Sequence, residues 1–201
     1  MKKTLPFFSY VFHPLFIPVF AVLYYFMLGP NFFSKEQMLL IVIQVSIILV
    51  FIPICIFYLL RMFGKVDSIM LAELSQRKIP LLIQGILIYI LLSNSLNIDQ
   101  VFELYFFFLG AMASTLSALL LALLKIRASL HMIGISALTT FVIGMSLHNH
   151  VNAINTIAFL VLLNGVIAAS RLKMKAHTVD ELIIGFCSGV GPQVALLYFW
   201  L

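Results

Sequence analysis

The sequence predicts an all-α, polytopic membrane helix bundle with about six to seven transmembrane helices. Of its 201 residues, 63% are hydrophobic and only 9% are charged, whereas a soluble domain carries roughly 25% charged residues. The apolar residues form runs close to the length of about 20 residues that a helix needs to cross a bilayer. These runs lack the alternation typical of strands, and lipid offers no water to unpaired backbone groups. A soluble enzyme, a disordered chain and a secreted disulfide scaffold are therefore excluded.

Seven apolar runs are predicted to be membrane spans of one domain covering residues 1–201. The predicted spans are residues 6–28, 38–62, 80–96, 101–124, 131–148, 153–170 and 179–200. Pro14 and Pro18 predict that the first span is kinked or partly re-entrant, since proline removes a helical hydrogen bond. The third span is short and is interrupted by Asn94 and Ser95.

Two features inside the spans predict how the helices pack. Gly185 and Gly189 are four residues apart on the seventh span, and this spacing of small residues favours close helix packing. Glu103 stands at the start of the fourth span. It is expected to be interfacial, and if it is buried it needs a partner.

The basic residues are distributed very unevenly between the two faces of the predicted bundle. With seven spans, the N-terminus and the connections after spans two, four and six share one face. Lys35 is the one basic residue on the opposite face. The face with the N-terminus carries the remaining eleven basic residues: Lys2, Lys3, Arg61, Lys65, Arg77, Lys78, Lys125, Arg127, Arg171, Lys173 and Lys175. The positive-inside rule places this basic face in the cytoplasm. Because the charges lie between apolar runs, the net charge of +5 does not indicate a nucleic-acid partner.

Three polar clusters lie on the basic face, and exactly two spans separate each cluster from the next. The clusters cover residues 73–80, 125–131 and 170–181. The candidate residues within them are Arg77, Lys78, Lys125, Ser129, His131, Ser170, Arg171, His177, Asp180 and Glu181. Because all three clusters return to the same face, we expect them to form one site at the membrane surface.

The residue types in these clusters are suited to phosphate chemistry. Arginine and lysine supply charge and donors for a phosphate group. His131 and His177 can divide the roles of nucleophile and acid. A carboxylate beside His177 can orient its ring, and both Asp180 and Glu181 are at helical spacing from it. A lipid substrate would keep its tail in the bilayer and present its phosphate to these loops.

The third cluster carries a motif of a known family. Ser170 and Arg171 are followed by five residues and then by His177, with Glu181 four residues later and Asp180 one position earlier. This resembles the pattern Ser-Arg-x5-His-x3-Asp of the type 2 phosphatidic acid phosphatase superfamily, the integral-membrane lipid phosphatases. Glutamate replaces aspartate at the acidic position.

The other two motifs of that family are partial here. Residues 128–131 read Ala-Ser-Leu-His and are similar to Pro-Ser-Gly-His, with the serine and the histidine retained. In place of Lys-x6-Arg-Pro, the chain has Arg77 and Pro80 with Lys78 between them, and Met70 stands at the lysine position. The resemblance covers about residues 65–190.

The resemblance implies a metal-independent lipid phosphatase without a cofactor. His177 would be the nucleophile that takes the phosphoryl group, His131 would protonate the leaving oxygen, and Glu181 or Asp180 would orient His177. The implied phosphate-binding residues are Arg171, Arg77, Ser129 and Ser170, with Lys78 or Lys125 in place of the missing lysine. The substrate classes are polyprenyl diphosphate, phosphatidylglycerol phosphate, phosphatidic acid and lipid A-type phosphates.

Several of these residues have an alternative, non-catalytic interpretation. Thr178 and Glu181 match a capping box, so Glu181 has helix capping as an alternative role, and one glutamate does not easily serve both. The alternative interpretation of His131 is an interfacial histidine without a functional role. Lys173 and Lys175 are expected to be anchors at the cytoplasmic face. Three further histidines are expected to be interfacial side chains without a role: His13, His148 and His150.

A non-catalytic membrane protein of the same fold, either a scaffold or a transporter, is the alternative function. A transporter would carry polar residues along a path through its spans, whereas Gln44, Thr139 and Asn164 are scattered and are explained by helix packing. The composition resembles that of a bacterial inner-membrane protein, with the bilayer and a lipid phosphate as partners. The sequence leaves the oligomeric state open.

Overall fold

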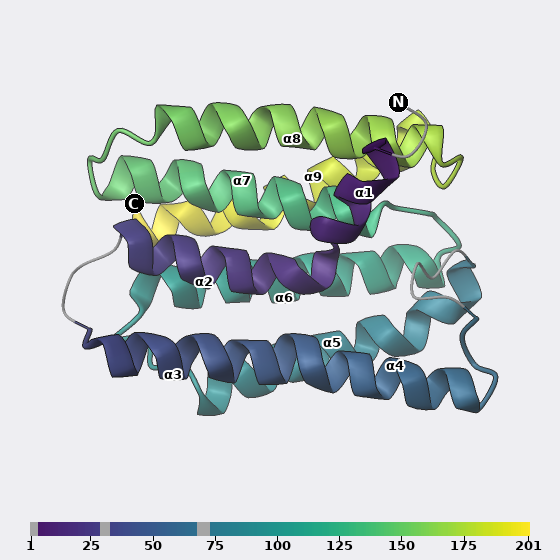
Figure 1. Ribbon diagram of the computed structural model, residues 1–201, viewed down its shortest axis with the longest axis horizontal. Helices are drawn as coiled ribbons and strands as arrows, with labels where there is room; N and C mark the ends of the chain where they lie inside the picture. Colours follow the sequence, from purple (N-terminus) through teal and green to yellow (C-terminus); the bar gives the residue numbers. More distant parts are fainter. Residues whose placement is uncertain (1–3, 29–32, 68–72) are drawn as a thin grey trace.

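The computed structural model describes residues 4–28, 33–67 and 73–201, and helix is the only regular secondary structure in these ranges. The elements are α1 (Thr4–Val11), the 3₁₀ turn η1 (Pro14–Phe16), α2 (Ile17–Leu28), α3 (Lys35–Ser46), the π-helical turn η2 (Ile47–Phe51), α4 (Ile52–Met62), α5 (Leu74–Asn94), α6 (Phe102–Leu123), α7 (Leu130–His148), α8 (Ile154–Lys173) and α9 (Val179–Trp200). The long helices run side by side along one axis, with α7 and α8 in one layer and α3, α4 and α5 in another (Figure 1). Six helical segments are long and apolar enough to cross a membrane. The predicted all-α membrane bundle is thus confirmed, and the protein is an integral membrane protein.

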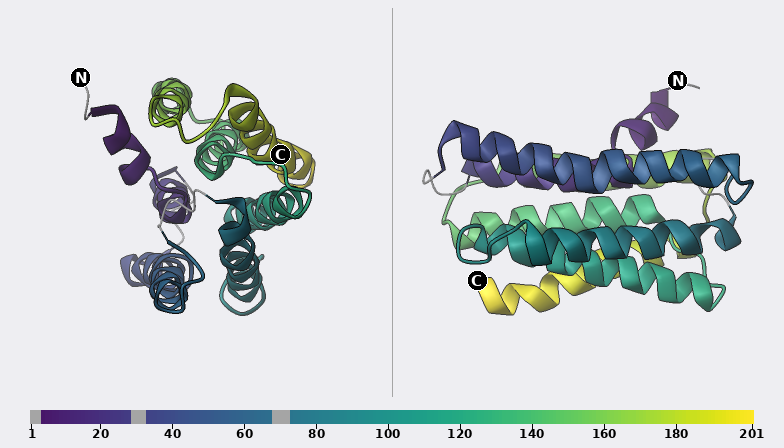
Figure 2. Two further views of the ribbon diagram at one scale, coloured as in Figure 1. Left: turned by 90° about the vertical axis from the view of Figure 1, so that its right-hand side faces the viewer. Right: turned by 90° about the horizontal axis from the view of Figure 1, so that it is seen from below.

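The first predicted span, over residues 6–28, is broken before Pro14, in line with the kink that its prolines predict. His13 is extended, with φ −64° and ψ 141°, since a residue before proline is driven out of the helical region. The break leaves α1 as a separate short helix, and the apolar helix that follows covers only Pro14–Leu28. Figure 2 shows α1 turned out of the common direction of the bundle, and α1 contacts α8.

The third span begins earlier than predicted. It starts at Leu74 instead of residue 80, so the first polar cluster lies in its opening turns and not before it. Pro80 lies inside the helix as its seventh residue, where its lack of an N–H removes one helical hydrogen bond. The second span is continuous from Lys35 to Met62, through the π-helical turn. The last four spans begin and end within three residues of the predicted boundaries.

Helix α7 is the centre of the bundle and is far more buried than the other five spans. It contacts α2, α6, α8 and α9. The predicted role of Gly185 and Gly189 in close packing is confirmed, because both press against the backbone of α7. A Cβ at Gly185 would lie 2.6 Å from the carbonyl oxygen of Ser129, and one at Gly189 would overlap the carbonyl oxygen of Ile133. The start of α9 is therefore held against the start of α7.

We expect Gly189→Ala to destabilise the protein, because the new methyl group meets a backbone carbonyl that cannot rotate away. Overpacking of this kind costs about 1–3 kcal/mol, so the midpoint of thermal unfolding in detergent should fall. Gly191→Ala is the matched control on the same helix, since nothing lies within 4 Å of a Cβ at Gly191. An equal loss of stability in both variants would contradict the close packing of α7 and α9.

The end of the bundle away from the N-terminus holds a buried carboxylate with a partner. Glu103 is buried, and its Oε1 lies 3.3 Å from Nε2 of His148. The contact with His148 provides the partner that a buried glutamate needs, and it joins α6 and α7.

Candidate active site

The three polar clusters of the sequence come together at one end of the bundle, the right-hand end in Figure 1. Nη1 of Arg77 at the start of α5 donates to the carbonyl oxygen of Ala128, at 2.9 Å. The backbone N–H of Ser129, which caps α7, donates to the carbonyl oxygen of Glu181 in the first turn of α9, at 3.0 Å. Since both contacts involve backbone groups, they position the helices themselves.

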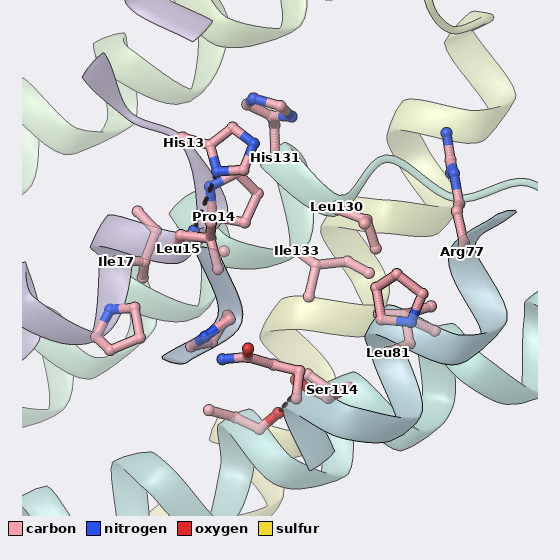
Figure 3. A pocket seen from close by; sticks show the side chains of 18 of the residues that line it. His13, Pro14, Leu15, Ile17, Arg77, Leu81, Ser114, Leu130, His131 and Ile133 are labelled. Atoms are coloured by element: carbon pink, nitrogen blue, oxygen red, sulfur yellow. Dashed lines mark hydrogen bonds between the residues drawn. The ribbon is translucent and has the colours of Figure 1, made fainter. Parts of the chain in front are cut away.

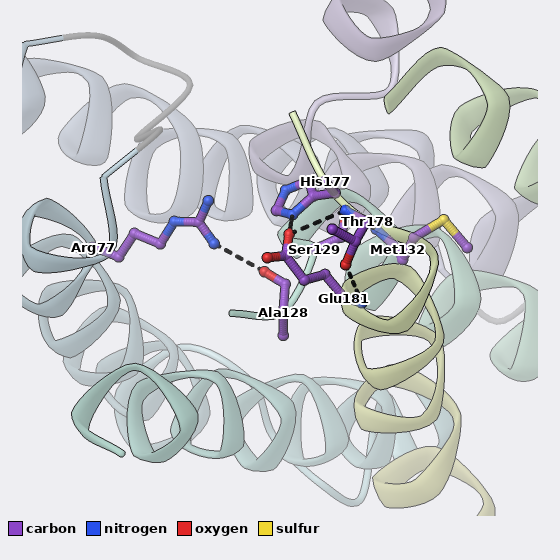
Figure 4. Close-up of polar contacts among 7 residues, drawn as sticks. All are labelled: Arg77, Ala128, Ser129, Met132, His177, Thr178 and Glu181. Carbon is purple, nitrogen blue, oxygen red and sulfur yellow. Dashed lines mark hydrogen bonds and ion pairs between the residues drawn. The ribbon is translucent and has the colours of Figure 1, made fainter. Parts of the chain in front are cut away.

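His177 and Glu181 form the central pair of the site (Figure 4). Nδ1 of His177 lies 2.7 Å from Oε2 of Glu181. A carboxylate only accepts hydrogen bonds, so Nδ1 carries the proton and Nε2 keeps its lone pair. Asp180 is exposed. Of the two candidate carboxylates, the structure therefore pairs Glu181 with the histidine.

Glu181 also closes the capping box at the start of α9. Its Oε2 accepts from the backbone N–H of Thr178 at 3.4 Å, and the hydroxyl of Thr178 accepts from the backbone N–H of Glu181 at 3.4 Å. The expectation that one glutamate cannot easily both cap a helix and orient the histidine is wrong, because Glu181 caps α9 and also pairs with His177. The histidine immediately precedes the N-cap residue, so the same carboxylate oxygen reaches both donors.

We expect the pKa of His177 to lie below the usual histidine value of 6.5. Burial disfavours the charged imidazolium, and Arg77 and Arg171 lower the pKa further, while Glu181 opposes them. A lowered pKa means that the neutral ring predominates at pH 7, with Nε2 unprotonated. Histidine-labelled NMR in detergent would measure this titration. A His177 pKa above 6.5 would contradict this arrangement of charges.

His131 is buried at the start of α7. Its Nε2 lies 2.9 Å from the carbonyl oxygen of Ser9 on α1. A carbonyl oxygen only accepts, so Nε2 carries the proton and Nδ1 is the remaining nitrogen that can exchange one. Helix α1 thus sets the tautomer of this histidine from outside the bundle.

One cavity of about 190 Å³ extends from these side chains between apolar residues of the spans. At one end it is lined by Arg77, Arg171, His131 and His177. The two arginines are 4% and 3% exposed, so their charges are held inside the protein. The rest of the lining is largely apolar and comes from α2, α4, α5, α6 and α7. Figure 3 shows Arg77 and His131 at the cavity together with the apolar side chains of Leu81 and Ile133.

The remaining predicted phosphate-binding residues do not line this cavity. Lys78 is half-buried and Lys125 is exposed, both outside the lining. The hydroxyl of Ser129 accepts from the backbone N–H of Met132, so it caps α7. The hydroxyl of Ser170 lies 2.7 Å from that of Ser9 and joins α8 to α1. Met70, at the lysine position of the first motif, lies outside the described residues.

His13 was expected to have no role, but it lies in the site. It lines the cavity with His131 and His177, and the ring centroids of His13 and His131 are 5.2 Å apart in an edge-to-face arrangement (Figure 3). The signal in the sequence was the His13-Pro14 dipeptide, which breaks the first apolar run at the basic face. No spacing rule relates this position to the three clusters.

No protein-family model, curated protein or solved structure matches this chain. Among the described residues, no group of three or more His, Cys, Asp or Glu side chains is placed to hold a metal ion.

Proposed function

We propose that this protein is an integral-membrane lipid phosphatase that hydrolyses a phosphomonoester or a diphosphate through a phosphohistidine intermediate. The cavity is the observation that carries the proposal. It has two buried arginines and three histidines at its polar end and apolar side chains beyond them. An amphiphile with a phosphate head matches both parts, because guanidinium groups bind phosphate oxygens and an apolar lining accommodates a hydrocarbon tail.

In the first step, Nε2 of His177 attacks the phosphorus atom. The P–N bond forms while the bond between phosphorus and the lipid oxygen breaks, and the leaving oxygen takes a proton from His131. Glu181 holds the Nδ1 proton of His177 and stabilises the positive charge that develops on the ring, as the carboxylate of a catalytic triad does. Arg77 and Arg171 stabilise the charge on the phosphoryl oxygens.

In the second step, water attacks the phosphohistidine. The water gives a proton to His131, the P–N bond breaks, and inorganic phosphate leaves. Because the Nε2 proton of His131 is held by the carbonyl oxygen of Ser9, Nδ1 is the atom that gives and takes the proton in the two steps. A bound phosphate dianion would favour the protonated form of His131 that the first step needs.

The substrate classes that fit are polyprenyl diphosphate, phosphatidylglycerol phosphate, phosphatidic acid and lipid A-type phosphates. The site lies at the end of the bundle that carries the basic connections, so we place it at the cytoplasmic face of a bacterial inner membrane. A non-catalytic scaffold or transporter of the same fold remains the alternative function.

The proposal is tested by phosphate release from the four lipid classes with detergent-purified full-length protein. Chelator is present and no metal is added, so that release does not depend on a contaminating metal enzyme. Release from one class above the background of His177→Ala supports the phosphatase and names its substrate. Folded protein that releases phosphate from none of them supports the non-catalytic alternative.

A further inference from the structure

We propose that His13, from the N-terminal segment, is a phosphate-binding residue of this site. Its Nε2–H group donates a hydrogen bond to a phosphate oxygen of the bound lipid. The proposal deepens the lipid phosphatase function and rests on it for the identity of the substrate. Three observations carry the proposal: the fold of the segment, the tautomer of the ring and the position of the ring in the cavity.

The local fold fixes the direction and the protonation of the ring. His13 is the N-cap of η1, and its Nδ1 accepts a hydrogen bond from the backbone N–H of Leu15 at 3.3 Å. A nitrogen that accepts is unprotonated, so the proton of the neutral ring is on Nε2. His13 therefore has a donor at its outer nitrogen, opposite the anchored one.

The position of the ring brings that donor to the polar end of the cavity. His13 shares the lining with Arg77, Arg171, His131 and His177. It comes from a part of the chain that the three polar clusters do not include, and it lies beside His131, with 5.2 Å between ring centroids. No lysine is among the residues that line the cavity, so an imidazole N–H joins the two guanidinium groups as a phosphate donor.

The anchoring of the segment indicates that this placement is specific. Two contacts of Ser9 attach α1 to the residues of the site. Its hydroxyl lies 2.7 Å from that of Ser170 on α8, and its carbonyl oxygen accepts from His131. The segment that carries His13 is thus held against two of the three clusters.

Two substitutions separate the proposed donor from the capping role. The side-chain oxygen of asparagine can reproduce the Nδ1 acceptor at an N-cap, so His13→Asn keeps the cap and removes the distant donor. The longer side chain of glutamine places an N–H group near the original Nε2, so His13→Gln restores the donor. The matched control is His150→Asn, an exposed position with φ 52°, a conformation that asparagine tolerates.

We expect His13→Asn to raise KM for the lipid phosphate about tenfold with little change in kcat, because a hydrogen bond to a charged group is lost from substrate and transition state alike. The dissociation constant for orthovanadate, a phosphate analogue, should rise by a similar factor in calorimetry. His13→Gln should recover most of both losses, while His150→Asn should match the wild type.

The outcomes distinguish the two proposals. If the wild type hydrolyses lipid and His13→Asn changes neither KM nor vanadate binding, the role of His13 is wrong and the phosphatase stands. The same conclusion follows if His13→Gln is as impaired as His13→Asn. If no lipid is hydrolysed but vanadate binds in a His13-dependent way, the anion site stands and the phosphatase is wrong. Absence of both hydrolysis and vanadate binding overturns both proposals.

Discussion

His177→Asn is expected to abolish phosphate release, with a loss of about 10⁴-fold or more in kcat, the scale seen when a nucleophile of a covalent mechanism is removed. Asparagine has no lone pair that can displace the lipid oxygen, so the two-step route is closed. Brief incubation of the wild type with lipid that carries radioactive phosphorus in its phosphate group should leave an acid-labile, base-stable label on the protein. His177→Asn should acquire no such label.

The control for this experiment is His150→Asn, which should keep both the label and the rate of release. His177 is 8% exposed, so the folded state of His177→Asn has to be checked separately, by its elution from a sizing column and its thermal unfolding. A correctly folded His177→Asn protein that still becomes labelled would exclude His177 as the nucleophile. His131 would then be the next histidine to test.

Much of the fold and the central pair of the site were predictable from local patterns. Length and hydropathy are sufficient to recognise a helix in lipid, so five of the six spans were predicted within three residues at both ends, and the third span was predicted closely only at its C-terminal end. His177 and Glu181 are four residues apart, and the first turn of a helix brings side chains at that spacing together. The convergence of the three clusters followed from counting spans, although the first span was partly misjudged.

The parts that were not predictable depend on contacts between distant segments. Ser9 and Ser170 are 161 positions apart in the chain, yet their hydroxyls meet, so the serine that matched a phosphate motif serves helix packing instead. Lys78 lies on the first turns of α5 beside Arg77, but only the arginine lines the cavity. Composition and spacing carry no information about which side of a helix turn faces a cavity until its neighbours are placed.

Glu181→Gln is expected to lower kcat by about 10²- to 10⁴-fold while leaving the protein nearly as stable as the wild type. The neutral amide cannot stabilise the charge that develops on His177, and it no longer enforces the tautomer with the proton on Nδ1, a change that is worth about 10⁴-fold in the serine protease triad. Glutamine is nevertheless a normal partner in a capping box. The bond to the backbone N–H of Thr178 can therefore survive, and α9 should still begin at the same residue.

Thr178→Ala is the reciprocal variant, and the pair separates the two roles of Glu181. Its hydroxyl accepts from the backbone N–H of Glu181, so its loss removes an N-cap worth about 1 kcal/mol and should lower the midpoint of thermal unfolding. The carboxylate and its 2.7 Å contact with His177 remain, so kcat should stay within a few fold of the wild type. Glu181→Gln should therefore lower kcat and keep the midpoint of thermal unfolding, whereas Thr178→Ala should lower the midpoint and keep kcat. If Glu181→Gln loses stability but keeps its rate, the glutamate only caps α9, and the tautomer of His177 has to be set by another group.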